Sequence, residues 1–228
     1  MRLLYNLICN RTPSRRTILA GALATMALAL SGCTKKWIWH QKVTVTVETP
    51  EGVKSASTVL SYVLEDTDGW YVLPEARGAG SGVRSGEAVV LEVAPGRYLF
   101  ALLPGPNPFE VFFPGKAHVE VAPQFDTLRE ARVVPPKLYP RLVTFGDIND
   151  PASVQRIDPA DLAASFGPGV RLKSITLEIT DAPVSTGKVE AVLGWLGPYP
   201  EPALFPVAPY DFSFAAKLRQ GQFILRGN

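Results

Sequence analysis

The side chains best suited to chemistry in this sequence are carboxylates that fall in two short acidic clusters. The clusters are Asp66-x-Asp68-Gly69 and Asp147-x-Asn149-Asp150. Oxygens of Asp and Asn are the ligands that Ca²⁺ prefers. Neither cluster continues to the distal glutamate that closes a calcium-binding loop, and Asp or Asn ahead of Gly or Pro is typical of turns. We therefore expect turns at both places and no metal site.

Paired carboxylates could also serve a hydrolase as general acid and base. The best candidates are Asp147 and Asp150 together with Asp158 and Asp161. Asp158 precedes Pro159 at the expected start of a helix, and Asp161 lies in the first turn, where both carboxylates stabilise the helix N-terminus. Because capping explains these positions, we predict no catalytic residue here.

The sequence offers little support for nucleophilic catalysis. The two histidines, His40 and His118, lie far apart and in no motif, so a serine nucleophile has no evident base and a zinc ion no evident ligand set. The glycine-rich run 78–82 lacks the Gly-x-Ser-x-Gly elbow and the Gly-x-Gly-x-x-Gly fingerprint. We expect that run to be a flexible hairpin tip and His118 to lie on a solvated strand face, and we predict neither an enzyme nor a bound cofactor.

Residues 1–32 have the organisation of an export signal and are predicted to be removed. They hold four arginines and no acid, followed by an apolar run of about 16 residues, shorter than the ~20 that a membrane span needs. The run ends in Leu30-Ser31-Gly32-Cys33, which resembles the lipobox of bacterial lipoproteins. The resemblance implies cleavage before Cys33, a diacylglyceryl group on its sulfur and an acylated amine. Several acyl chains are what stable membrane anchoring requires.

Two export routes stay open. Arg15 and Arg16, with a hydrophobic residue two positions after the pair, resemble the twin-arginine export signal, although Ile18 stands where Phe is favoured. An ordinary positively charged signal explains the same residues. Thr34, rather than Asp, follows Cys33, and the resemblance to lipoprotein sorting implies the periplasmic face of the outer membrane.

Composition limits the partners of the mature chain. The 228 residues are 46% hydrophobic and 19% charged and include 21 prolines, which favours a folded, turn-rich chain without long helices. Removal of 1–32 takes away four of the 23 basic side chains, so 19 remain against 21 acidic ones and the formal charge becomes −2. No basic stripe remains for nucleic acid. The only cysteines are Cys9, in the removed part, and Cys33, so we expect no disulfide.

The first part of the mature chain is predicted to be β structure. We expect a lipid-anchored tether over 33–41 and a β-sandwich domain over 42–134. Valines and threonines alternate along 42–48, and Trp37 and Trp39 keep the valines' phase, which favours a strand over a place in the membrane interface. Further strands are predicted over 57–65, 88–93, 98–103, 109–113 and 117–121.

A turn in this part carries a resemblance of its own. In Ala94-Pro95-Gly96-Arg97, Pro and Gly occupy the two central positions of a type II turn. The Pro-Gly-Arg-Tyr sequence at the start of the next strand is similar to that of transthyretin-type and immunoglobulin-like modules. The resemblance implies a sandwich of two antiparallel sheets.

The second part, 135–228, is predicted to be a smaller α+β segment with one short helix, Asp158–Gly167. A strand is expected over 141–145, and a longer one over 170–180 carries a change of phase that predicts a bulge near Lys173-Ser174. Residues 142–196 resemble a family of uncharacterised Gram-negative bacterial proteins, which implies no particular activity. The resemblance rests on Leu142-Val143-Thr144-Phe145, Asn149-Asp150-Pro151, Phe166-Gly167-Pro168-Gly169 and Trp195-Leu196.

The tail from Trp195 onward interleaves prolines with aromatic residues. Tyr199, Phe205 and Tyr210 mark a candidate partner surface, since stiff extended backbone with aromatic faces suits a partner's groove. The same composition suits a strap that packs on the protein's own sheet. We prefer this interpretation, because most aromatic side chains of globular proteins lie in the core.

These observations predict an outer-membrane lipoprotein with a non-catalytic binding or assembly role, held to the membrane by lipid on Cys33 and contacting an envelope protein. The alternative is a periplasmic lipoprotein that binds a small apolar or glycan ligand. An exposed apolar patch would favour the first function, and a concave apolar pocket the second.

Overall fold

The computed structural model describes residues 35–67, 78–196 and 203–227. Almost all of them belong to one unit, Lys36–Asp66 with Ala79–Asn228, and a second unit, Met1–Lys35 with Thr67–Gly78, falls mostly outside the described ranges. Several residues named above lie outside the described residues. They are Cys9, Arg15, Arg16, Ile18, Leu30, Ser31, Gly32, Cys33, Thr34, Asp68, Gly69 and Tyr199.

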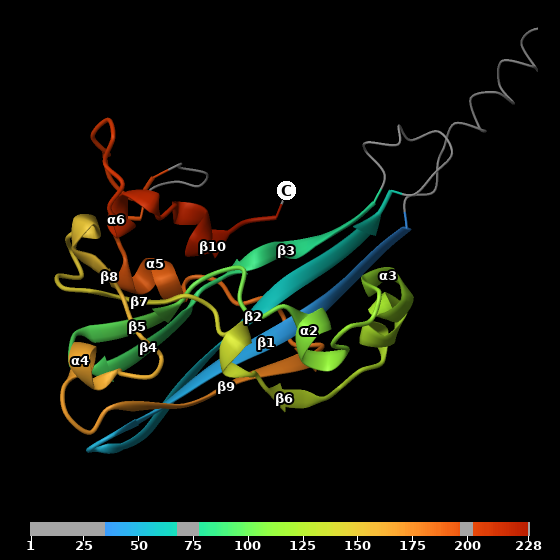
Figure 1. The fold of residues 1–228 in the computed structure, drawn as a ribbon, viewed down its shortest axis with the longest axis horizontal. Coiled ribbons are helices and arrows are strands. Elements are labelled where there is room, and N and C mark those ends of the chain that lie inside the picture. Colours follow the sequence, from blue (N-terminus) through green and yellow to red (C-terminus); the bar gives the residue numbers. More distant parts are fainter. Residues whose placement is uncertain (1–34, 68–77, 197–202, 228) are drawn as a thin grey trace, which may run out of the picture. The chain divides into compact units, whose positions relative to one another are not determined.

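The larger of two antiparallel sheets has six strands in the order β10-β3-β2-β1-β9-β6 (Figure 1). The strands are β1 (Lys35–Thr49), β2 (Gly52–Asp66), β3 (Ala79–Glu87), β6 (Ala131–Val133), β9 (Arg171–Thr180) and β10 (Ile224–Leu225). Long β1 and β2 form the centre, since the alternating apolar residues of 43–47 and 60–64 each bury one face. The sheet therefore combines strands from both ends of the chain.

The second sheet has four strands in the order β4-β5-β7-β8. They are β4 (Val89–Ala94), β5 (Arg97–Ala101), β7 (Leu142–Phe145) and β8 (Val154–Arg156). The predicted turn joins β4 to β5, and Gly96 takes the positive φ of +69° that the third position of a type II turn requires. Leu99 and Ala101 of β5 face one side of the sheet and Phe100 the other, and all three are buried.

Two hydrophobic cores follow from this arrangement. The inter-sheet core joins Val43 and Val45 of β1 and Ile175 of β9 to Leu91 and Leu99 of the second sheet. The C-terminal core lies on the other face of the second sheet, where the tail supplies much of its cover. Its fully buried members are Ala88, Phe100, Leu102, Val143, Val189, Leu193, Leu218 and Phe223. The fold is thus a mainly β sandwich whose second sheet is covered on one face by the first sheet and on the other by a small α segment and the tail.

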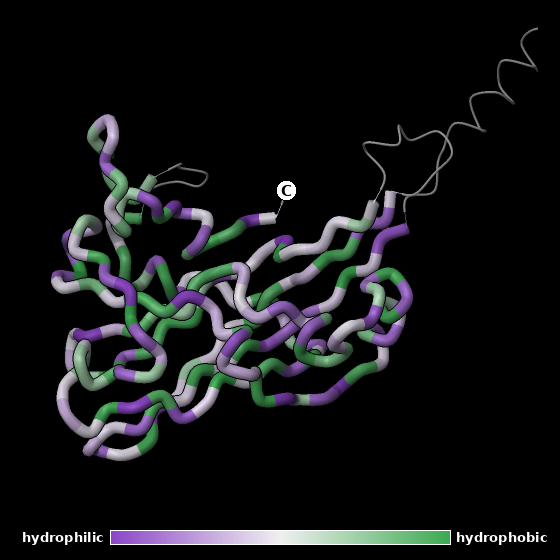
Figure 2. The backbone as a smooth tube through the Cα atoms, in the orientation of Figure 1, coloured by the Kyte–Doolittle hydropathy of each residue, from purple (hydrophilic) through white to green (hydrophobic). Residues whose placement is uncertain are grey.

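The predicted phase of the strands is confirmed. Val43, Val45 and Val47 are buried, and Figure 2 shows hydrophobic and hydrophilic residues alternating along the strands. The β1–β9 register passes from Thr46↔Ser174 to Val47↔Leu172, so Lys173 is an extra residue. The bulge expected near Lys173-Ser174 is therefore present.

Two of the predicted strands are helices instead. The 109–113 stretch forms α2 (Pro108–Phe112), because the Asn107 side chain accepts a hydrogen bond from the Phe109 N–H and Pro108 fits the first helical turn. The 117–121 stretch forms α3 (His118–Val121), followed by a 3₁₀ turn η2 (Ala122–Asp126). The expectation of strands at both places was wrong, because alternation over five residues does not exclude a helical turn and the buried Phe109 and Val121 pack these short helices into the inter-sheet core.

The predicted single helix of the second part is also corrected. Asp158 and Asp161 hold successive turns through bonds from the Ala160 and Ala164 N–H groups, and the helix itself is only α4 (Ala163–Phe166). Two more short helices follow, because buried apolar residues pack each of them against the second sheet. The remaining helical elements are α5 (Lys188–Val192), α6 (Phe214–Lys217), η3 (Pro136–Leu138), η4 (Pro151–Ser153) and η5 (Gln220–Gln222).

Three predicted boundaries move. A division at 134/135 does not separate two sets of strands, since β9 pairs with β1 and β7 pairs with β5. The tether predicted over 33–41 is largely strand, because β1 already starts at Lys35. The glycine-rich run 78–82 is not a hairpin tip, since β3 pairs from Ala79 onward with the end of β2.

None of the helices in the described ranges is long and apolar enough to cross a membrane.

Candidate functional site

The first half of the tail packs on the protein. Leu204 is buried in the C-terminal core and Phe205 is half-buried against it. The Gln220 side chain donates to the Ala203 carbonyl at 3.2 Å, which fixes the start of this stretch. Phe205 therefore belongs to a strap on the second sheet, as the preferred reading of the tail predicts.

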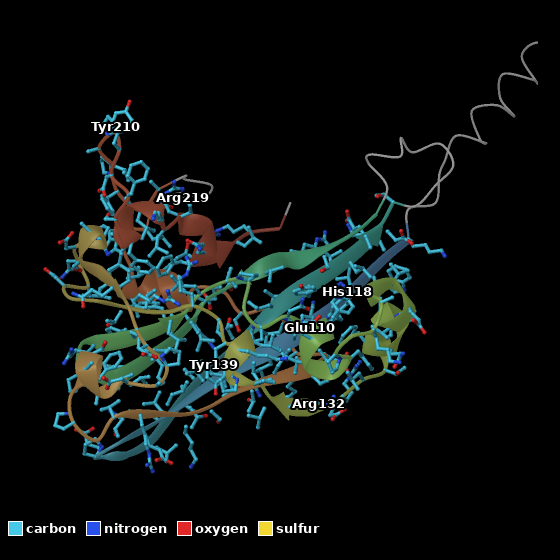
Figure 3. The ribbon with its side chains drawn as sticks, in the orientation of Figure 1. Glu110, His118, Arg132, Tyr139, Tyr210 and Arg219 are labelled. Carbon is cyan, nitrogen blue, oxygen red and sulfur yellow. The ribbon has the colours of Figure 1, made fainter. Side chains whose placement is uncertain are left out.

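The next residues leave the surface as an exposed loop, 206–213, which we call the aromatic loop. Each of its residues is exposed, including Tyr210 at 88% and Phe212 at 72%. Figure 3 shows Tyr210 at the outer end of this loop, with Arg219 nearer the body of the protein. Large apolar side chains at such exposure are costly to keep in water, and neighbouring ones mark interaction sites.

Hydrogen bonds hold the aromatic loop in shape. The Asp211 N–H donates to the Ala208 carbonyl at 3.1 Å, and the Ser213 N–H donates to Asp211 Oδ1 at 2.8 Å. Ser213 Oγ then accepts from the Ala216 N–H at 3.2 Å and caps α6. Tyr210 has φ of +68°, a left-handed conformation that is uncommon for an aromatic residue. The two exposed rings are therefore presented by an ordered turn.

The charge at the tip is negative. Two hydrogen bonds from Ser213 to the Asp211 carboxylate, the larger from its backbone N–H and the smaller from its hydroxyl, lower the pKa of Asp211 from the usual value. Asp211 is consequently ionised at neutral pH and lies in sequence between the two exposed rings. The aromatic loop thus offers two apolar side chains separated by one fixed anion.

Two arginines contact the residues that follow the aromatic loop. Arg219 Nη1 donates to the carbonyls of Ala216 and Leu218 at 2.7 and 3.0 Å and so closes the end of α6. The Arg141 guanidinium carbon lies 6.0 Å from the centre of the Phe214 ring. The second contact connects the end of the loop to the residue just before β7.

The second acidic cluster is engaged in turns. Asp147 Oδ1 accepts from the Asn149 N–H and Asp150 Oδ1 from the Ala152 N–H, both at 2.9 Å. These are the Asx-turn bonds that such residues make with their own backbone. Within 35–67, 78–196 and 203–227, no group of three or more His, Cys, Asp or Glu side chains could hold a metal ion.

The histidines have structural contacts. The His118 ring stacks on Phe109 with centroids 4.0 Å apart, so its predicted place on a solvated strand face was wrong. His40 Nδ1 lies 2.8 Å from the Ala182 carbonyl oxygen.

A hollow of about 260 Å³ lies beside His40 and is also lined by Arg129. The Arg129 guanidinium donates to both carboxylate oxygens of Asp181 at 2.8 and 2.5 Å. Since that cation is paired, the hollow offers little attraction to an anion.

The predicted partner surface is therefore divided. Phe205 packs inward and Tyr210 points outward, and Tyr199 lies outside the described residues. Phe212 was missed, although it stands two positions after Tyr210 in the same proline-rich stretch, and that spacing was the available signal.

No family model, no curated protein and no solved structure matches this chain.

Proposed function

We propose that the mature protein is a lipid-anchored component of the bacterial envelope that binds a protein partner through the aromatic loop, in a non-catalytic role. The observation that carries the proposal is the exposure of Tyr210 and Phe212 on an ordered turn. Tyrosine and phenylalanine are enriched where protein interfaces have their buried centre. Ordering the loop before binding lowers the entropy cost of association.

Asp211 supports a protein partner over the lipid bilayer. Burying an ionised carboxylate in an apolar medium is strongly unfavourable, and the anionic phospholipids of a membrane repel it. A protein can instead supply apolar pockets for the two rings and an N–H or cationic donor for the carboxylate. We therefore expect the partner to present such a donor between two apolar depressions.

The anchor is supported by the signal-like residues 1–32 and the lipobox-like Leu30–Cys33. Since β1 begins at Lys35, two residues after Cys33, the intervening chain can span at most about 7 Å. Within the larger unit, the start of β1 and the aromatic loop lie toward opposite ends of the horizontal axis in Figure 1.

Metabolic labelling tests the anchor. Cells that express the full chain should incorporate labelled palmitate into it, and Cys33→Ser should abolish both the label and the cleavage before residue 33. A Cys9→Ser variant is the control, because that thiol belongs to the predicted signal. Palmitate on the Cys33→Ser protein would refute lipidation at this residue.

Site-specific photo-crosslinking in living cells tests the partner. A photoreactive amino acid at position 212 should yield one dominant crosslinked envelope protein, and Tyr210→Ala should remove that product. Val133, 67% exposed on β6, provides the control position for the photoreactive residue, and Val133→Ala the control substitution. Identical products from positions 212 and 133, or a product that persists in Tyr210→Ala, would contradict binding through the aromatic loop.

A further inference from the structure

The first sheet ends in an edge strand, β6, whose outer side pairs with no other strand of the described ranges. β6 lies beyond β9 at one end of the sheet, and residues 129–133 are all exposed, Val133 at 67%. Figure 1 shows β6 at the lower margin of the larger unit. An edge strand presents a row of backbone N–H and C=O groups that can bind a further strand.

The register with β9 shows which backbone groups of β6 point outward. The ladder extends from Glu130, whose carbonyl accepts from the Ile179 N–H at 3.1 Å, to Val134, whose N–H donates to the Ile175 carbonyl at 2.8 Å. Backbone groups of alternate residues in an antiparallel strand point to the same side. Those of 130, 132 and 134 therefore point to β9, and those of 131 and 133 point away from the sheet.

The side chains of this edge carry charges in a defined order. Arg132 donates through Nε and Nη2 to the two carboxylate oxygens of Glu130 at 2.7 and 3.2 Å, and through Nη1 to the Phe112 carbonyl at 3.0 Å. The bond from Arg132 lowers the pKa of the Glu130 carboxyl, so this group is ionised at neutral pH. The edge thus presents one anion and one cation, two residues apart and held in place.

We propose that β6 pairs with β6 of a second copy of this chain, antiparallel and centred on Ala131, so that the first sheets of the two copies become continuous. In this register Ala131 lies opposite its own counterpart, and the two residues exchange both backbone hydrogen bonds. Glu130 of each copy lies opposite Arg132 of the other, and opposite charges directly across two strands stabilise the pair. Each charge then has only opposite charges beside it.

Other registers of the same two strands are disfavoured. A shift of one residue would set the outward backbone groups of one copy against groups that the other copy has already bonded to β9. A shift of two would place either Arg132 opposite Arg132 or Glu130 opposite Glu130, where like charges repel. A shift of four, centred on Val133, would place Ala131 opposite Pro135, which has no N–H to donate. Charge complementarity therefore selects one register.

The pairing ends with two copies, because each copy uses the same edge of the sheet and the opposite edge, β10, has only two residues. The inference does not depend on the proposed function, since the aromatic loop follows the strap on the second sheet and β6 belongs to the first. A photoreactive residue at 133, the control position for the loop, should accordingly capture a second copy of the chain and remain distinct from position 212.

Disulfide crosslinking of the purified full chain in detergent tests the pairing and its register. Directly opposed residues of a hydrogen-bonded antiparallel pair have Cα atoms about 5.5 Å apart, which a disulfide can span. Ala131→Cys should therefore form a disulfide-linked dimer under mild oxidation, seen in a non-reducing gel. The unaltered chain, treated in the same way, controls for Cys9 and Cys33.

Val133→Cys is the matched control, because it lies on the same exposed face of the same strand. In the proposed register the two introduced thiols are offset by four residues, about 13 Å along the strands, too far for a disulfide. Crosslinks that arise from random collision would instead form equally well at both positions. A clear excess of dimer from Ala131→Cys is therefore the expected result.

Charge exchange tests the basis of recognition in chains without an added cysteine. Glu130→Arg should weaken the dimer about tenfold in sedimentation equilibrium, because two attractive pairs become repulsive. Glu130→Arg combined with Arg132→Glu restores opposite charges and should restore the dimer, with circular dichroism confirming that both variants are folded. The proposal is overturned by no dimer from Ala131→Cys, by a yield from Val133→Cys that equals it, or by a folded double exchange that stays as weak as Glu130→Arg.

Discussion

Gly86 occupies a position that only glycine fits, and Gly86→Ala should therefore be strongly destabilising. A Cβ at this position would lie 2.5 Å from Leu60 Cδ2 and 3.2 Å from Leu60 Cα. The first distance is well inside van der Waals contact, and the Leu60 side chain is itself 1% exposed in the inter-sheet core and has little room to move. The backbone of Gly86 also has φ of +140°, which side chains disfavour.

Two costs add in this variant. The left-handed backbone contributes about 2 kcal/mol, and overpacking of the core contributes about 2 kcal/mol more. For a chain of this size, the sum of about 4 kcal/mol lowers Tm by about 8–16 °C. Thermal unfolding of the purified full chain, followed by circular dichroism, measures this shift.

Gly52→Ala is the matched control. Gly52 has a similar φ of +127° but has no atom within 4 Å of the added Cβ, so only the backbone cost applies. We expect a loss of about 2 kcal/mol, half that of Gly86→Ala. The difference between the two variants isolates the contact with Leu60.

A double-mutant cycle with Leu60→Ala examines the same contact directly. Leu60→Ala alone should cost about 3 kcal/mol by leaving a cavity, but it also removes the Cδ2 atom that the new Cβ would strike. The double variant should therefore be about 1–2 kcal/mol more stable than the sum of the single changes. Strict additivity, or a Gly86→Ala variant no less stable than Gly52→Ala, would refute the reasoning.

Three further predictions concern buried and titrating groups. The Asp211 carboxyl should titrate in NMR with a pKa below the usual 3.8, and Ser213→Ala should raise that pKa. Because the pKa is lower in the folded state, ionised Asp211 stabilises the fold at pH values above its unfolded pKa. This contribution is lost as the pH falls through the folded pKa. Trp39→Phe should change the unfolding free energy by no more than about 1 kcal/mol, since it removes an indole N–H that is buried without a partner among the described residues. Phe125→Ala should instead lower the unfolding free energy by about 4 kcal/mol, because it leaves a cavity where a fully buried ring packed. Burial raises the pKa of Tyr62 above 10, and Ser81→Ala should raise it further in a spectroscopic pH titration, because the Ser81 bond opposes the shift.

The strand pattern of this protein could largely be predicted from local sequence. Val43, Val45 and Val47 carry the phase of β1, and the change of phase along 170–180 located the extra residue Lys173. Side chains alternate between the faces of a strand, so the pattern is visible without knowledge of the partner strand. The turn at Pro95-Gly96 could also be predicted from neighbouring residues alone, because Pro and Gly fit the backbone angles of its two central positions.

Short helices were the main error in secondary structure. Alternation over 117–121 is compatible with a strand, but the structure has α3 there, and its His118 stacks on Phe109 of α2. Helices of four or five residues have little stability of their own. They form because the inter-sheet core buries Phe109 and Val121, which is a contact between distant parts of the chain.

The candidate sites divide in the same way. Prolines and aromatic residues identified the tail as unusual, but Phe205 and Tyr210 cannot be told apart by composition, and only the packing of the C-terminal core buries one and leaves the other exposed. Nothing in the local sequence singles out Glu87. Its burial arises because the tail pairs with β3 and because two backbone N–H groups at the start of α5 donate to one carboxylate oxygen.

Residue types and their spacing within a few positions are enough to predict the signal-like and lipobox-like N-terminal pattern, the predominance of β structure and the inward face of each long strand. Tertiary structure decided that β9 lies between β1 and β6, that the second sheet is covered on both faces, and which aromatic side chains remain in solvent. Strand order and burial are set by the free energy of contacts between segments far apart in the chain, and those contacts exist only once the chain has folded.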